Sequence, residues 1–144
     1  MTKRCMNTTM QRMSAAKARK STKKSDRPVA CPLPPEEQQT LIEAIEQAHG
    51  AEVLSAATCR APGAWDNLRV LARGNNDSAP AIIRSLRPGD VMLHNHPDGN
   101  LQPSDADISV ASLCGKSGIG FAIHDNECTE FYVVVEPFVE KAPE

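Results

Sequence analysis

Residues 91–124 read VMLHNHPDGNLQPSDADISVASLCGKSGIGFAIH and contain one complete supersecondary unit. The uncharged run VMLHN at 91–95 predicts a buried strand, and IGFAIH at 119–124 predicts a second one. Between them, Ser104 is a preferred helix N-cap, and the residues after it predict a helix that ends near Gly115. Strand, helix and strand form a βαβ unit, whose two strands we expect to be parallel.

Apolar runs on both sides of this unit predict the rest of the domain. Pro35 suits the first turn of a helix, and His49-Gly50 suits its C-terminal end. Shorter apolar runs predict strands, and the polar segment GNNDS predicts a loop before a short helix. The strands are expected over 51–58, 65–73 and 128–135, a turn over 125–127, the loop over 74–78, and the short helix around Ile82, Ile83 and Leu86. Together these elements predict a single α/β domain over residues 36–136.

The charge of the chain is distributed unevenly. The 144 residues carry a formal net charge of −2, but residues 1–27 contain nine Lys and Arg side chains against one acid. This segment is poor in large aliphatic side chains, so it cannot bury enough surface to offset its ordering entropy. We therefore expect a disordered basic tail over 1–27, a stiff Pro-rich linker over 28–35 and a charged C-terminal tail over 137–144.

The basic tail admits several interpretations. A disordered basic segment binds a phosphate backbone or an acidic protein surface. The same composition is compatible with a solubilising extension and with a start codon upstream of the natural one at Met6, Met10 or Met13. It also resembles a transit peptide, because such segments are acid-poor and contain Arg and Ser.

Composition excludes several classes of protein. No apolar run approaches the roughly 18 to 20 residues of a membrane helix, and no apolar block near the N-terminus resembles a secretory signal. The five cysteines are odd in number and form no C-x-x-C pair, which argues against a disulfide framework and a zinc knuckle. We therefore expect a cytoplasmic protein with reduced thiols that does not contact a membrane.

Two histidines at the end of the 91–95 strand are the first candidates for chemistry. His94 and His96 are two residues apart, so their rings project from one face of the sheet and can converge on one ion. Neutral imidazoles suit Zn²⁺, and a catalytic zinc site usually has three protein ligands and one open position. Asp107 can supply the third ligand, because the loop at 97–103 turns the chain back beside the strand end. The sequence therefore predicts a Zn²⁺ site.

Ser104 and Glu52 are candidates for the remaining catalytic roles. Ser104 precedes Asp107 by about one helical turn, so its hydroxyl would lie near the metal and could donate to an oxyanion. Glu52 is the one charge in the predicted strand 51–58, and a buried carboxylate suits a general base. Each residue has a simpler interpretation, since S-x-x-D is a common capping box and a strand glutamate often faces solvent.

The spacing H-x-H-x₇-S-x₂-D at 94–107 would arise by chance on the order of once in a few thousand chains of this composition. It resembles the signature of the JAMM (JAB1/MPN/Mov34) zinc metallopeptidases. HNHP followed by a glycine-containing loop is most similar to the bacterial RadC-type branch. RPGDVMLHNHPDGN at 87–100 and GFAIHDNECTEFYVVVEP at 120–137 are similar to JAB domains found ahead of DinG-type helicases.

The resemblance covers roughly residues 36–136 and implies a fold and a set of roles. The fold would be of the JAB/MPN type, which is cytidine-deaminase-like, with a mixed sheet flanked by helices in a single domain. The zinc ligands would be His94, His96 and Asp107, the general base Glu52 and the oxyanion stabiliser Ser104. The chain departs from RadC-type proteins at Asp98, where they usually have Ser, and we expect the added charge to alter substrate preference.

The resemblance implies a zinc-dependent hydrolase that cleaves a peptide or isopeptide bond in a protein substrate through metal-activated water. The alternative is a non-catalytic or regulatory RadC-like module in DNA repair or helicase function. In that case the basic tail would contact DNA, and the chain would act with a helicase partner or as part of a helicase fusion. A zinc deaminase is disfavoured, because no P-C-x-x-C ligand pair follows the histidines.

Overall fold

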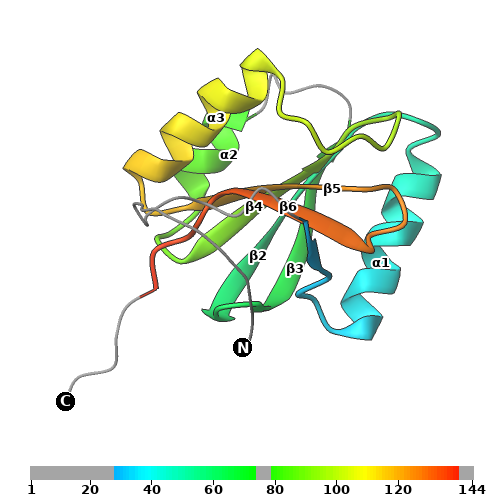
Figure 1. Ribbon diagram of the computed structural model, residues 1–144, viewed down its shortest axis with the longest axis horizontal. Coiled ribbons are helices and arrows are strands. Elements are labelled where there is room, and N and C mark those ends of the chain that lie inside the picture. Colours follow the sequence, from blue (N-terminus) through cyan, green and yellow to red (C-terminus); the bar gives the residue numbers. More distant parts are fainter. Residues whose placement is uncertain (1–27, 74–78, 140–144) are drawn as a thin grey trace, which may run out of the picture.

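The computed structural model describes residues 28–73 and 79–139, which form an α/β domain (Figure 1). Its sheet is mixed and six-stranded, with the strand order β1-β6-β5-β4-β2-β3. The elements are β1 (Val29–Ala30), α1 (Pro35–Gln47), β2 (Val53–Ala61), β3 (Ala64–Arg73), α2 (Ala79–Ser85), β4 (Asp90–Asn95), α3 (Asp105–Lys116), β5 (Gly120–His124) and β6 (Glu130–Val135). The predicted fold class is confirmed, and this architecture is compatible with a JAB-like fold.

The predicted βαβ unit lies at the centre of the sheet. Strands β4 and β5 pair in parallel, from Val91 opposite Gly120 to Asn95 opposite His124, and α3 connects them. Every residue of β4 and of β5 is buried, which explains why both strands read as nearly continuous apolar runs. The expectation of two parallel strands is confirmed.

The sheet separates two apolar cores, and alternate residues of each central strand face opposite sides. On one face, α1 packs through Leu41 and Ile45 onto a cluster that includes Leu93. On the other face, α2 and α3 cover Met92 and Phe121, as the positions of the helices in Figure 1 show. His94, which belongs to β4, therefore lies on a strand that is held from both faces.

Several predicted boundaries were wrong, because strand pairing decided them. β2 runs over Val53–Ala61 rather than 51–58, so Glu52 lies just before the strand, not within it. The cause is a hairpin in which Ala61 pairs with Ala64. The last strand begins at Glu130 rather than at 128, because Cys128 adopts a left-handed backbone conformation with φ of 57°.

The predicted linker over 28–35 was also partly wrong. Val29 pairs with Phe131 and Ala30 with Glu130, so this segment adds an edge strand to the sheet, and α1 already begins at Pro35. The predicted tail 1–27, the predicted loop 74–78 and residues 140–144 of the predicted C-terminal tail lie outside the described residues. Among the helices of the described ranges, none has the length and hydropathy of a membrane span.

Gly120 offers a test of how closely the C-terminal segment packs on β5. A Cβ atom at this position would lie 2.8 Å from Pro137 Cδ and 2.9 Å from Pro137 N, so Gly120→Ala should lower the free energy of unfolding by about 1–3 kcal/mol. Gly115→Ala is the matched control, because its Cβ would meet Val135 Cγ1 at an ordinary 3.6 Å and α3 should gain about 0.5–1 kcal/mol. Urea unfolding of both variants tests this, and equal stability of the two would contradict it.

Candidate metal centre

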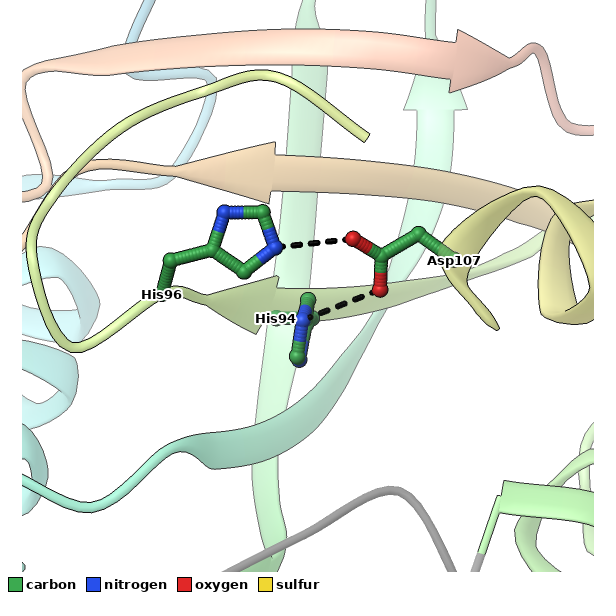
Figure 2. Close-up of side chains that lie close together, drawn as sticks. All are labelled: His94, His96 and Asp107. Carbon is green, nitrogen blue, oxygen red and sulfur yellow. Dashed lines mark hydrogen bonds and ion pairs between the residues drawn. The ribbon is translucent and has the colours of Figure 1, made fainter. Parts of the chain in front are cut away.

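The candidate site lies where β4 ends and α3 begins. His94 is the next-to-last residue of β4, and His96 is the first residue after the strand. Asp107 is in the first turn of α3. The two histidines are on one side of the strand end because they are two residues apart. Figure 2 shows both rings facing the Asp107 carboxylate, which reaches toward them from the helix. The structure thus brings the three predicted ligands together.

The distances among the three side chains suit a shared metal ion. His96 Nε2 lies 2.8 Å from Asp107 Oδ2, and His94 Nε2 lies 3.2 Å from Asp107 Oδ1. One possible ligand atom from each residue lies within 4.8 Å of the others, and all three residues are buried. Two ligands at about 2.0–2.1 Å from a tetrahedral zinc are about 3.3 Å apart, so only a small outward movement would admit the ion.

Unsatisfied buried atoms provide the test of whether a metal fits. His94 and Asp107 are each only 1% exposed, yet both ring nitrogens of His94 and Oδ1 of Asp107 have no hydrogen-bond partner. Buried polar atoms without partners are costly and therefore rare. A cation between His94 Nε2 and Asp107 Oδ1 would satisfy both, and the set of two imidazoles and one carboxylate suits zinc. The residues present therefore fit a metal.

A capping box at the start of α3 fixes the Asp107 carboxylate. The Asp107 backbone N–H donates to Ser104 Oγ at 3.1 Å, and the Ser104 backbone N–H donates to Asp107 Oδ2 at 2.9 Å. The simpler interpretation of S-x-x-D is thereby confirmed. In this capping box the Ser104 hydroxyl group accepts a hydrogen bond through its oxygen, so the capping box does not use the hydroxyl proton. Ser104 as an oxyanion stabiliser stays a prediction.

The protonation of the two histidines follows from their surroundings. Burial lowers the pKa of His94 to about 4, so its ring is neutral at pH 7 and able to bind a metal. Burial acts in the same direction on His96, but hydrogen bonds with the Asp107 carboxylate and the Asn100 carbonyl raise its pKa above the ordinary value. His96 Nδ1 lies 2.9 Å from Asn100 O, which orients Nε2 toward Asp107.

The two carboxylates have opposite pKa shifts. Burial acts to raise the pKa of Asp107, but hydrogen bonds from Ser104 and His96 hold it below its ordinary value, so this carboxylate is ionised and able to bind a cation. Burial raises the pKa of Glu52, with His96 opposing and Asp107 reinforcing the shift. The raised pKa makes Glu52 a stronger base than a solvent-exposed carboxylate, which suits a general base.

Glu52, the residue just before β2, lies beside the cluster. Its Oε1 atom lies 3.8 Å from His94 Nδ1, beyond hydrogen-bonding distance, and its side chain is 24% exposed. An open cavity of about 440 Å³ adjoins the cluster and is lined by Glu52, His96, Pro97, Asp98, Asn100, Gln102, Ser104 and Asp107. The lining contains no Lys or Arg side chain, so a substrate would meet a surface of carboxylates beside the metal ligands.

Asp98 lies on the exposed part of this lining. Its Oδ1 atom accepts hydrogen bonds from Asn100 N at 3.0 Å and from Asn100 Nδ2 at 2.8 Å. These bonds keep the pKa of Asp98 below its ordinary value, so the residue is negatively charged at pH 7. The charge expected from the sequence is therefore at the cavity, and its effect on substrate preference stays a prediction.

Sequence reasoning missed two asparagines that hold the site. Asn95, between the two histidines, accepts a hydrogen bond from the backbone N–H of Val53, and Asn126, in the turn after β5, accepts one from Asn95. Neither residue belongs to the H-x-H-x₇-S-x₂-D pattern. One local signal pointed to Asn95, because a polar residue at the end of a buried apolar strand requires a hydrogen-bond partner.

Comparison with known proteins gives a local similarity. A UPF0758 protein of Chlorobaculum parvum is 47% identical over 38 residues, which are 26% of this chain and 17% of that protein. A UPF0758 protein of Chlorobaculum tepidum is 45% identical over 38 residues, again 26% and 17% of the two chains. One of Lactococcus lactis subsp. cremoris is 41% identical over 46 residues, 29% of this chain and 20% of that protein.

The chain thus covers at most about a fifth of the length of these relatives. No family model matches it. UPF0758 proteins are RadC-like, which is consistent with the RadC-type resemblance of the sequence. The similarity covers this short stretch and does not extend to an activity.

Substitution of Asp107 tests the metal centre. Asp107→Asn removes the anionic ligand at nearly constant shape, so zinc affinity measured by calorimetry should fall by at least about 100-fold. Asp105→Asn is the matched control, because Asp105 is an exposed acid in the same first turn of α3. It should lose the same favourable interaction with the helix dipole and keep wild-type zinc affinity. Equal zinc affinity in the two variants would contradict the assignment of Asp107.

Proposed function

We propose that this protein is a zinc-dependent hydrolase that cleaves a peptide or isopeptide bond in a protein substrate. The observation that carries the proposal is the convergence of two histidines and one aspartate, with buried unpaired atoms, beside an open cavity that also contains a carboxylate of raised pKa. Three protein ligands and an accessible side are typical of catalytic rather than structural zinc. The local similarity to UPF0758 proteins is compatible with this function.

Glu52 acts as the general base and then as the general acid. A bound zinc ion supplies Lewis acidity, which polarises a carbonyl group and lowers the pKa of a water molecule to about 7. The Glu52 carboxylate takes a proton from a water molecule in the cavity and passes it to the nitrogen of the leaving amine. Its raised pKa suits both steps, and its position beside His94 places it next to the metal ligands.

Ser104 stabilises the oxyanion. Its oxygen accepts the Asp107 N–H, which fixes the position of the hydroxyl group, while its proton is available to a carbonyl oxygen in the cavity. A donor that is already oriented costs no reorganisation when the charge develops. Asp107, His94 and His96 have a different role, because they would hold the metal beside the cavity.

Replacement of Glu52 separates metal binding from catalysis. Glu52→Gln should keep zinc affinity within about threefold of wild type, because Glu52 is not a ligand, and lower kcat by about 10²–10⁴. Cleavage of a proteome-derived peptide library is followed by mass spectrometry, with zinc content measured on the same samples. Glu43→Gln, at an exposed position of α1, is the control and should cleave like wild type. Full cleavage by the Glu52→Gln variant would refute the proposed mechanism.

A second candidate function rests on the charge asymmetry of the chain. We propose as an alternative that the protein is a regulatory module in DNA repair or helicase function, whose residues 1–27 contact DNA. The described residues carry six basic and fourteen acidic side chains, so the domain itself should repel a phosphate backbone, whereas residues 1–27 have a net charge of about +8.

Salt dependence distinguishes this alternative. If residues 1–27 bind DNA, affinity for a fluorescent duplex should fall by at least about 10³ between 50 and 200 mM salt, and deletion of these residues should abolish binding. Tight binding after the deletion would assign the contact to the domain and contradict the alternative. Absence of binding by the full chain would leave the hydrolase as the supported function.

A further inference from the structure

We propose that Asn95 and Asn126 form a brace that positions Glu52 over the metal ligands. This inference rests on the hydrolase function proposed above, and it assigns both asparagines as positioning residues that act through Glu52. The brace is a chain of three hydrogen bonds, which links the start of β2, the end of β4 and the turn between β5 and β6.

The first bond holds the peptide group that joins Glu52 to Val53. The N–H of that group donates to Asn95 Oδ1 at 2.8 Å, and the bond is buried. Backbone pairing between β2 and β4 includes Leu54 opposite His94, and the Asn95 side chain continues the pairing one residue further. Val53 has no backbone partner in β4, so the Asn95 side chain accepts its N–H on that side of the strand.

The second and third bonds fix the orientation of the Asn95 amide. Asn95 Nδ2 donates to Asn126 Oδ1 at 2.8 Å, and Asn126 Nδ2 donates to the Pro97 carbonyl oxygen at 3.0 Å. Because each amide both donates and accepts, a flip of either one would place like groups together. Pro97 directly follows His96, so the brace connects the backbone beside the base to the backbone beside a metal ligand.

Glu52 needs such a brace because its carboxylate has no anchor of its own. Within the described ranges, no hydrogen bond holds this carboxylate, and its closest ion-pair contact is the 3.8 Å approach to His94 Nδ1. Its position over the ligands therefore depends on the backbone. A displacement of about 1 Å in a catalytic group can lower the rate by about 100-fold.

Asn126→Ala is the main test, because Asn126 is half-buried in a turn and its replacement should not unfold the protein. Replacement of Asn95, which is 1% exposed, would leave a buried N–H without a partner. In the zinc-loaded full chain, kcat for a peptide that wild type cleaves should fall by about 10- to 100-fold with KM within about twofold. Zinc affinity should stay within about threefold of wild type. Glu127→Ala, an exposed neighbour in the same turn, is the control and should change none of these values.

Two further readouts separate positioning from a structural role. The Val53 amide should exchange its hydrogen at least about tenfold faster in Asn126→Ala than in wild type, which can be measured without any substrate. In the Glu52→Gln background, Asn126→Ala should cause no further loss of residual activity, because both changes act on the same group. The same fold loss in both backgrounds would overturn the inference, as would unchanged Val53 exchange.

The outcome also distinguishes this inference from the function on which it rests. If zinc-loaded wild type cleaves no peptide, the hydrolase proposal fails, and the positioning role fails with it. If wild type cleaves and Asn126→Ala cleaves equally well, only the brace is wrong.

Discussion

The contact between the Asp107 carboxylate and the two histidines of the β4 end is the interaction on which the site depends. One oxygen of this carboxylate completes the capping box of α3 and accepts from His96, while the other faces His94 without a hydrogen bond. Asp107 thus completes the capping box of α3 and also brings the third candidate ligand to the two histidines.

The topology explains why the candidate metal ligands and the proposed base Glu52 lie at one edge of the sheet. Parallel pairing of β4 and β5 requires a crossover helix, and the N-terminus of that helix returns to the edge where β4 ends. Antiparallel pairing of β2 with β4 brings the start of β2 to the same edge, so Glu52 arrives from the opposite direction. Hydrogen bonds of Asn95 and Asn126 link the start of β2, the end of β4 and the turn after β5 at this edge.

The parts of the fold that depend on nearby residues could be predicted from the sequence, and the parts that depend on distant pairing could not. The spacing of His94, His96 and Asp107 is local to one βαβ unit, so periodicity and a capping signal were enough to expect their approach. The strand at Val29–Ala30 exists only because β6 offers a free edge, and the limits of β2 follow from its hairpin with β3.

The hydrogen bonds of Asn95 could not be predicted from the sequence either, because its partners Val53 and Asn126 are remote along the chain. Burial of Glu52 could be anticipated only as a property of a predicted strand, and the residue proved to lie outside that strand. For both Asn95 and Glu52, the sequence pattern does not show which strand lies next to the residue.

We propose that His94, His96 and Asp107 share one zinc ion. X-ray absorption at the zinc edge, on the full chain loaded with zinc and freed of unbound metal, tests it most directly. If these three residues share the ion, the spectrum should show one zinc per chain with nitrogen and oxygen ligands at about 2.0–2.1 Å and outer-shell scattering from two imidazole rings. A chain that retains no zinc, or a spectrum dominated by sulfur at about 2.3 Å, would contradict it.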